Sequence, residues 1–319
     1  MSQMSSRPYA VVLAGGGGTR LWPLSSPERP KPFLPLLHGR SPLAVTLERL
    51  APLVPIDDTY IVAAANQVPL VRECAPQIAA ERILAEPVSR NTGAAVTLAA
   101  TAIERAGDSV MMVIPADHAV SDPAAWRAAL AGAADRASRE AGSLYTLGVV
   151  PTRPETGFGY IVADGARVSR FTEKPHRDEA ERLIAAGARW NAGTFVWRRD
   201  SLRSALERCA PALLAGIGEY STVQAGPIDT LLMEPAAAAG LVRTLPLDCG
   251  WSDIGSWGEL RAHLLSPTSA EEIRMAAPGG RTIVISNEHG VIALQPGGAA
   301  TMNLEQMSGS ELRAASERG

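Results

Sequence analysis

A short apolar run followed by a glycine turn stands near the start of the chain. The run is Tyr9-Ala-Val-Val-Leu13, and four consecutive glycines, Gly15 to Gly18, come just after it. Five residues are too few for a helix, and β-branched side chains favour a strand. Because polar residues do not alternate within the run, we predict a strand buried on both faces, which is typical of a parallel sheet.

Short apolar runs alternate with helical segments through the first half of the chain. We predict strands at 59–63, 110–114 and 144–150, and helices at 43–53, 91–105 and 123–140. Ser41-Pro42 and Asp122-Pro123 each place a capping residue and a proline at a helix start, and Asn91 is interpreted as the N-cap of a third helix. Strand, helix and strand at this spacing predict an α/β fold with a doubly wound, mostly parallel sheet.

The pattern changes after Pro151. Residues 157–162 and 168–171 are apolar runs with Asp164-Gly165 between them, which is typical of a hairpin and predicts an antiparallel insertion. Further predicted elements are helices at 178–186 and 200–208, a strand at 192–197, and short β runs at 282–285 and 291–294. We expect one large domain, residues 1–265, and a short β-containing C-terminal appendage, residues 266–319, with a polar, partly disordered tail from residue 303.

Composition excludes several classes of protein. The 319 residues are 46% apolar and 20% charged, which is enough to bury a core without disulfides or metals. A net charge of −3 lacks the basic footprint of a nucleic-acid binder. We find neither a membrane span nor a signal peptide, and the three cysteines are widely spaced. We therefore expect a cytoplasmic protein that binds neither nucleic acid nor membranes.

The glycine turn could approach a phosphate through its backbone N–H groups. A dinucleotide fingerprint needs a third glycine five residues after the first, where this chain has Arg20 or Leu21, and a P-loop needs Gly-Lys-Ser/Thr. Thr19, Arg20 and, after a proline-rich loop, Lys31 follow instead, so two cations would lie near any bound phosphates. The alternative is a flexible turn with surface charges.

The segments around the glycine turn and several later segments resemble a known family. The stretch from Leu13 to Leu24, followed by Pro30-Lys-Pro-Phe33, closely resembles the signature of the sugar nucleotidyltransferases, and among them the mannose-1-phosphate guanylyltransferases. Further matching segments, in the same order, are Glu86-Pro-Val-Ser-Arg-Asn-Thr92, Pro115-Ala-Asp-His118, Phe171-Thr-Glu-Lys-Pro175, Trp190-Asn-Ala-Gly-Thr-Phe195, Ile228-Asp229 with Met233-Glu234, and Gly250-Trp-Ser-Asp-Ile-Gly-Ser-Trp257. Ordered matches over about residues 9 to 260 are far more specific than any one motif.

The resemblance implies a Rossmann-like nucleotidyltransferase fold over the large domain. It also implies an enzyme that transfers GMP from GTP to mannose 1-phosphate, forming GDP-mannose and pyrophosphate, with both substrates as small-molecule partners. The sugar phosphate would attack the α-phosphorus of the triphosphate. Because both reactants are anionic, this reaction needs cations and in-line placement more than it needs a protein nucleophile.

Two aspartates match the family's metal ligands and would hold Mg²⁺. Asp117 follows the predicted strand at 110–114, and Asp253 lies in a Gly/Trp-rich loop far away in the sequence. Hard oxygen ligands suit Mg²⁺. Asp117 could equally be an N-cap or a turn residue, and Asp253 a turn residue. His118 is interpreted as structural rather than as a ligand, because Mg²⁺ prefers oxygen.

By the same resemblance, Arg20 and Lys31 are the candidate catalytic residues, and Arg20 would stabilise charge on the transferring phosphoryl group. The candidate nucleotide-binding residues are Leu13, Ala14, Gly15, Gly16, Gly18, Thr19, Glu86, Arg90, Asn91 and Thr92. Guanine has N–H donors at N1 and N2 that a carboxylate or amide could accept. The sequence does not indicate which side chain of the 86–92 segment would accept them.

The candidate sugar-phosphate-binding residues are Gly159, Glu173, Lys174, Asn191 and Gly193. The resemblance assigns the phosphate to Lys174 and the sugar hydroxyls to Glu173, with backbone and amide hydrogen bonds from the other three. The alternative for Glu173 and Lys174 is a solvated ion pair on the surface.

Two other functions stay open. The same chemistry could act on another sugar 1-phosphate or another base, or the chain could be a non-catalytic, nucleotide-sugar-binding regulatory homologue. The presence of the cations and acids as a complete set favours chemistry. Family members usually continue into a β-rich arm that helps to form a dimer. About forty residues follow Gly279 here, so a homodimer is an expectation that the sequence leaves open.

Overall fold

The computed structural model describes residues 7–16, 19–265, 272–277, 281–286, 290–295 and 298–301. The chain divides into two compact units. The first comprises Met1–Gly15, Leu47–Ala116 and Val120–Trp251, and the second comprises Gly16–Thr46, Asp117–Ala119 and Ser252–Gly319. The predicted domain boundary after residue 265 stays a prediction.

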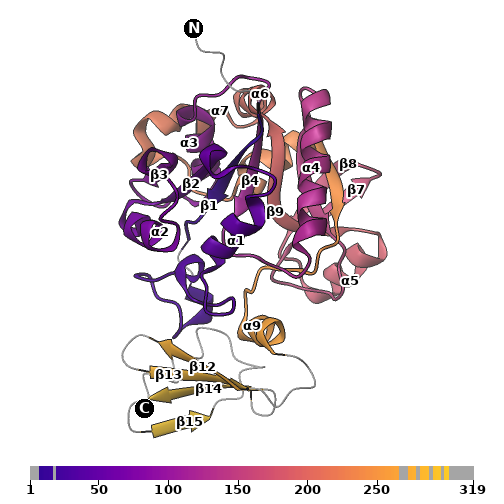
Figure 1. The fold of residues 1–319 in the computed structure, drawn as a ribbon. Coiled ribbons are helices and arrows are strands. Elements are labelled where there is room, and N and C mark those ends of the chain that lie inside the picture. Colours follow the sequence, from indigo (N-terminus) through magenta and orange to yellow (C-terminus); the bar gives the residue numbers. More distant parts are fainter. Residues whose placement is uncertain are drawn as a thin grey trace. The chain divides into compact units, whose positions relative to one another are not determined.

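The first unit is built around a mixed sheet. In the described part of the chain this sheet has nine strands in the order β3-β2-β1-β4-β9-β6-β10-β8-β7. Figure 1 shows β3, β2, β1, β4 and β9 following one another across it. The strands are β1 Tyr9–Leu13, β2 Thr59–Ala64, β3 Ile83–Glu86, β4 Val110–Pro115, β6 Leu144–Val149, β7 Gly159–Asp164, β8 Arg167–Glu173, β9 Arg189–Arg198 and β10 Val242–Leu247. β1 pairs in parallel with both β2 and β4, and β2 pairs in parallel with β3. This reversal of strand order at β1 confirms the doubly wound α/β prediction.

Antiparallel strands interrupt the parallel order. β9 lies between β4 and β6 and runs antiparallel to both. β7 and β8 form a hairpin whose connection contains Gly165 with φ 56°, a left-handed conformation that glycine adopts without strain. The predicted antiparallel insertion is therefore confirmed, and β9 extends beyond the predicted 192–197 at both ends.

The helices are α1 Pro42–Leu50, α2 Val68–Cys74, α3 Asn91–Ala102, α4 Pro123–Arg139, α5 Arg177–Ala185, α6 Arg199–Cys209, α7 Pro211–Gly216, α8 Glu234–Ala238 and α9 Trp257–Leu264. Two predicted N-caps are present. The carboxylate of Asp122 accepts the N–H groups of Ala124 and Ala125, each at 2.9 Å, and Oγ of Ser41 accepts that of Ala44 at 3.2 Å. Among the described residues, no helix is long and apolar enough to cross a membrane.

The predicted N-cap at Asn91 is wrong. Arg90 occupies the N-cap position and Asn91 is the first helical residue, with φ 70°. Asparagine tolerates positive φ better than most residues, and its side-chain oxygen accepts the N–H of Thr92 in the first turn of the helix at 2.7 Å. α3 also ends at Ala102, before the predicted residue 105.

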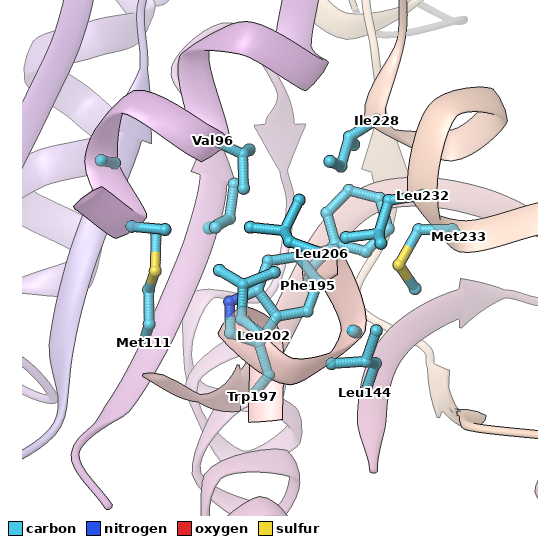
Figure 2. Packing of buried hydrophobic residues seen from close by; sticks show 14 of the residues in the cluster. Val96, Met111, Leu144, Phe195, Trp197, Leu202, Leu206, Ile228, Leu232 and Met233 are labelled. Carbon is cyan, nitrogen blue, oxygen red and sulfur yellow. The ribbon is translucent and has the colours of Figure 1, made fainter. Parts of the chain in front are cut away.

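One face of the sheet packs against α3, α6 and the chain around α8. Phe195 and Trp197 of β9 stack with their ring centroids 5.5 Å apart. Figure 2 shows them beside Leu202 and Leu206 of α6. The alternate strand residues point to the other face, where α4 packs against β4, β9, β6 and β10. Burial on both faces explains why these strands read as continuous apolar runs.

The second unit has its own apolar core. Leu21, Leu24, Ile254, Trp257 and Ile283 are buried in it. An antiparallel sheet contains β12 Glu272–Ala277, β13 Arg281–Ser286, β14 Gly290–Gln295 and β15 Gly298–Thr301, which confirms the β runs predicted at 282–285 and 291–294. Two short strands, β5 Ala119–Val120 and β11 Trp251–Ser252, pair with each other. The predicted tail at 303–319 lies outside the described residues.

Candidate functional site

In the first unit, the start of the glycine turn lies against Glu86. β1 and β3 are parallel and end at Leu13 and Glu86, so Ala14, Gly15 and the carboxylate lie at the same edge of the sheet. A Cβ added at Gly15 would be 3.2 Å from Oε2 of Glu86, so the absence of a side chain allows this approach. In the second unit, Gly16 has φ 127°, which favours glycine. Gly18 and the side chain of Thr19 lie outside the described residues.

In the second unit, the ammonium of Lys31 bridges the two predicted metal ligands. Lys31 begins a 3-10 turn, Lys31–Phe33, and its side chain is only 6% exposed. Its Nζ donates to Oδ2 of Asp117 at 2.9 Å and also to the main-chain carbonyl of Asp253. The fold thus brings both aspartates to one nitrogen, although they are far apart in the sequence.

Arg20 adds a second cation to this cluster. Its Nη1 lies 3.4 Å from Oδ2 of Asp253, and its side chain is 63% exposed, so much of the guanidinium surface is accessible. Oδ1 of Asp253 accepts the N–H of Gly255 at 2.9 Å. Ile254 between them has φ 43°, an unusual conformation for a β-branched residue. The hydrogen bond from Gly255 orients the Asp253 carboxylate, and the neighbouring strained backbone is of a kind that is common at functional sites.

The charges around the two aspartates shift their pKa values in opposite directions. Burial would raise the pKa of Asp117, but Lys31, His118 and Arg20 outweigh it and lower that pKa to about 2. Burial and the neighbouring Glu259 raise the pKa of Asp253, and His118, Lys31 and Arg20 only partly oppose that rise. Asp117 is therefore a carboxylate throughout the physiological range.

The side chains of this cluster would supply at most part of the ligands of a metal ion. Among the described residues, His, Cys, Asp and Glu side chains do not form any group of three that could hold a metal. Two aspartates nevertheless suit Mg²⁺, which commonly takes one or two carboxylates and completes its shell with phosphate oxygens and water. Nε2 of His118 lies 3.9 Å from Oδ1 of Asp117 and makes an ion pair only when protonated.

The predicted nucleotide segment is bonded to a second segment of the first unit, residues 220–228. The Tyr220 hydroxyl donates to Oε1 of Glu86, and the Arg90 guanidinium donates to the carbonyl of Ser221. The N–H of Ile228 donates to Oγ1 of Thr92 at 2.8 Å. Three of the four predicted side chains, those of Glu86, Arg90 and Thr92, therefore order this neighbouring segment.

The predicted sugar-phosphate residues meet where β7, β8 and β9 adjoin. A Cβ on Gly159 would lie 2.7 Å from Oε2 of Glu173 and 3.6 Å from Cβ of Asn191, so these residues are in close contact. Lys174 follows β8 with φ 45°, and its Nζ lies 3.2 Å from Oε1 of Glu173. Both of these side chains are well exposed.

The Asn191 side chain is held at both ends. Its Nδ2 donates to Oδ1 of Asp229 at 2.5 Å, and its Oδ1 accepts the N–H of Gly193 at 3.0 Å. Gly193 has φ 60°, which again favours glycine. The amide is therefore preorganised at the junction with β7 and β8.

Sequence reasoning assigned no role to two acids beside this amide. Burial, together with the charges of Glu173 and Glu234, raises the pKa of Asp229 to about 6. Burial and Glu173 also raise the pKa of Glu234. The Ile228-Asp229…Met233-Glu234 match pointed to both residues but gave no role, and the π-helix Asp229–Met233 that turns Asp229 toward Asn191 has no sequence signature we could use.

A doubly wound sheet with a glycine turn after its first strand is typical of phosphate-binding α/β proteins. The chain belongs to the nucleotidyl transferase family, whose family model matches residues 9–266. A known structure of similar fold is a "mannose-1-phosphate geranyltransferase" from Thermus thermophilus. It is 38% identical, has a TM-score of 0.72, and is matched over 83% of this chain and 81% of its own.

Two relatives of known name are longer than this chain. The xanthan biosynthesis protein XanB of Xanthomonas campestris is 38% identical, matched over 78% of this chain and 58% of its own length. The mannose-1-phosphate guanylyltransferase of Escherichia coli is 35% identical, matched over 80% of this chain and 59% of its own. The chain therefore spans about three fifths of the length of these relatives.

Proposed function

We propose that the chain transfers GMP from GTP to mannose 1-phosphate, releasing pyrophosphate and forming GDP-mannose. The carrying observation is the contact of the Lys31 nitrogen with both Asp117 and Asp253, beside Arg20. Positive charges fixed by neighbouring aspartates suit transfer between two phosphates, because the repulsion between the phosphates must be offset and the developing negative charge stabilised. The names of the relatives in Thermus thermophilus and Escherichia coli support mannose 1-phosphate as the acceptor, and that in Escherichia coli supports guanosine as the nucleoside.

In the reaction, an oxygen of the sugar phosphate forms a bond to the α-phosphorus of GTP. The bond from that phosphorus to the oxygen bridging the α- and β-phosphates breaks, and pyrophosphate leaves with the electron pair. Lys31, held rigidly by Asp117, supplies a positive charge that needs no reorganisation during the reaction. The exposed Arg20 can bind two phosphate oxygens with its planar guanidinium.

Asp117 and Asp253 would hold a divalent cation, Mg²⁺ by the chemistry of their oxygen donors. When bound, such an ion would neutralise phosphate charge and orient the reacting groups. The low pKa of Asp117 keeps that ligand ionised. Lys31 keeps the two aspartates near each other through its own contacts to both.

The sugar phosphate would bind in the first unit. The accessible ammonium of Lys174 would bind the phosphate, while Glu173 and the fixed amide of Asn191 would bind hydroxyls. We add Asp229 to this set, because its Oδ1 accepts the hydrogen bond that holds the Asn191 amide. Leu13, Ala14, the glycine turn and the segment from Glu86 to Thr92 would bind the nucleotide.

We also propose a cytoplasmic enzyme whose partners are small molecules rather than nucleic acid or membranes, and which forms a homodimer. Residues 1–265 would form its catalytic domain, and residues 266–319 its appendage. Size-exclusion chromatography with light scattering tests the dimer, and a monomer at micromolar concentration would contradict it.

The experiment that tests the function measures pyrophosphate release with Mg²⁺. GTP, ATP, UTP and dTTP are each combined with mannose 1-phosphate and with other hexose and heptose 1-phosphates. Turnover restricted to GTP with mannose 1-phosphate is expected. Turnover with another pair would keep the chemistry and replace the substrates, and release from no pair would favour a binding-only protein.

A further inference from the structure

A buried acid and a phenol from distant parts of the first unit form a pair beside the glycine turn. Glu86 is 3% exposed and Tyr220 is 8% exposed, and the Tyr220 hydroxyl donates to Oε1 of Glu86. Tyr220 comes from the 3-10 segment Ile217–Thr222, more than 130 residues further along the chain. This hydrogen bond leaves the other oxygen, Oε2, directed at Gly15.

The charge of Glu86 limits what can bind at this end of the turn. A carboxylate 3.2 Å from the Cβ position of Gly15 would repel a phosphate placed there, and burial weakens the screening of that repulsion. A neutral group with N–H donors would be attracted instead. Guanine carries two such donors on one edge, at N1 and N2, whereas the matching edge of adenine presents an acceptor at N1.

The hydrogen bond from Tyr220 also affects whether the Glu86 carboxyl group is ionised. Burial raises the pKa of Glu86, while the hydrogen bonds from Tyr220 and from the backbone of Arg90 oppose that rise. A protonated Glu86 would become a donor at one oxygen and lose its match to guanine. The phenol therefore favours both the position and the ionised form that guanine needs.

The segment that carries Tyr220 is itself anchored to the Glu86 side. The N–H of Gly226 donates to the carbonyl of Arg90 at 3.2 Å, and the N–H of Gly93 donates to the carbonyl of Gly226 at 3.0 Å. A Cβ on Gly93 would lie 2.9 Å from that carbonyl oxygen, so the two backbones pack directly. The phenol is thus delivered to Glu86 by a rigid support.

We propose that Tyr220 is a positioning residue for base selection, holding the Glu86 carboxylate so that Oε2 accepts N–H donors of a purine base beside Gly15. The inference rests on the proposed function, because it assumes a nucleotide at the glycine turn. Tyr220 lies outside the motifs that match the family. The proposal also assigns base recognition in the 86–92 segment to one side chain, the carboxylate of Glu86.

The test compares GTP with ITP, which lacks the N2 amino group, and with ATP. We would measure kcat/KM for each nucleotide at saturating mannose 1-phosphate in the wild type, Tyr220→Phe, Glu86→Gln and the double variant. Tyr220→Phe should lower the GTP to ITP ratio about tenfold, because one oriented hydrogen bond to a charged group is lost. The loss should fall on the KM for GTP, while the KM for mannose 1-phosphate stays within about twofold of the wild type.

Tyr145→Phe is the matched control. Tyr145 is also buried and donates to a glutamate, through Oη to Oε2 of Glu140, but it belongs to none of the proposed binding groups. This variant should leave the GTP to ITP ratio unchanged. Thermal unfolding of both variants reports whether either change acts through stability.

The double variant decides whether Tyr220 acts through Glu86. In the Glu86→Gln background, Tyr220→Phe should change the ratio by less than about twofold, because coupled residues are not additive. An unchanged ratio in folded Tyr220→Phe, or the same tenfold change without Glu86, would overturn the inference. If the wild type turns over no pair, the proposed function fails, and calorimetric binding of GTP and ITP to the same variants still tests Tyr220.

Discussion

Lys31 and Lys174 are both proposed to supply positive charge for phosphates, yet their surroundings in the structure are opposite. They are the two lysines of the sequence, among 30 Lys plus Arg. The Lys31 side chain is 6% exposed, with its nitrogen on Asp117 and Asp253, whereas that of Lys174 is 63% exposed and paired with Glu173. Arginine supplies every other permanent side-chain cation of the chain.

The positive charge of Lys31 is fixed in position, whereas that of Lys174 can move to a new partner. Burying an ammonium is unfavourable unless partners replace its water, and the two oxygens around Lys31 do so. A fixed charge stabilises a transition state without reorganising. An exposed ion pair contributes little free energy, so its lysine can exchange the carboxylate partner for a ligand. Lys31 should therefore govern turnover, and Lys174 should govern substrate affinity.

The largest expected effect is that of Lys31→Met, which keeps the length of the side chain and removes its charge. We expect kcat to fall by about 10²–10³-fold, as for the loss of one preorganised hydrogen-bond donor to developing negative charge in other enzymes. Asp117 also loses its partner, so the variant should unfold at a lower temperature. Steady-state pyrophosphate release and thermal unfolding check both points. A kcat within tenfold of the wild type would remove the distinction between the two lysines.

Asp253→Asn sharpens the comparison, because Asp253 holds Lys31 through its main-chain carbonyl. The variant keeps that contact and removes a proposed metal ligand. Turnover at limiting Mg²⁺ should fall by about 10- to 100-fold, and excess Mg²⁺ should recover part of the loss. Asp135→Asn, at an exposed ion pair on α4, is the control. Near-normal turnover at limiting Mg²⁺ would refute the metal assignment.

Lys174→Ala tests the adaptable lysine. The KM for mannose 1-phosphate should rise about tenfold, while kcat and the KM for GTP change by less than about twofold, because a charge-assisted contact to one substrate is lost. Substrate titrations at saturating partner concentration check this. Equal effects on both Michaelis constants would count against a specific role.

The smallest expected effect is a pH-dependent change in stability. The pKa of Asp229 is raised to about 6 in the folded protein, above its ordinary 3.8, so stability is lost as pH rises from about 4 to 6. Asp229→Asn removes that loss and should stabilise the protein by about 1–2 kcal/mol above pH 6, with little effect below pH 4. Thermal unfolding between pH 4 and 8 measures it. Equal differences at all pH values would show that the buried charge is not the cause.

Much of the fold could be predicted because its signals are local. The apolar run of β1, the Asp122-Pro123 helix start and the Asp164-Gly165 turn each depend on a few neighbouring residues, and the structure has all three. The position of β9 between β4 and β6 depends on pairing between distant strands. β10 was not predicted, because Arg243, Thr244 and Pro246 dilute its apolar pattern.

In the site, too, local features could be predicted from the sequence and contacts between distant segments could not. The resemblance pointed to Lys31, Asp117 and Asp253. Nothing in their spacing showed that the Lys31 nitrogen contacts both aspartates. The Tyr220–Glu86 and Asn191–Asp229 hydrogen bonds were also beyond sequence reasoning, because each joins segments that only the folded sheet brings together. The N-cap prediction at Asn91 was wrong by one position, since Arg90 precedes the helix and Asn91 begins it.

The position of β9 also has a consequence for the growing chain on the ribosome. Both neighbours of β6 in the described sheet, β9 and β10, lie later in the sequence. About 50 residues separate the end of β6 from the end of β9, which is roughly 2 to 10 seconds of synthesis at 5–20 residues per second. During that interval the apolar β6 has both edges open to other chains. Chaperones that shield nascent strands should therefore raise the soluble yield of this protein.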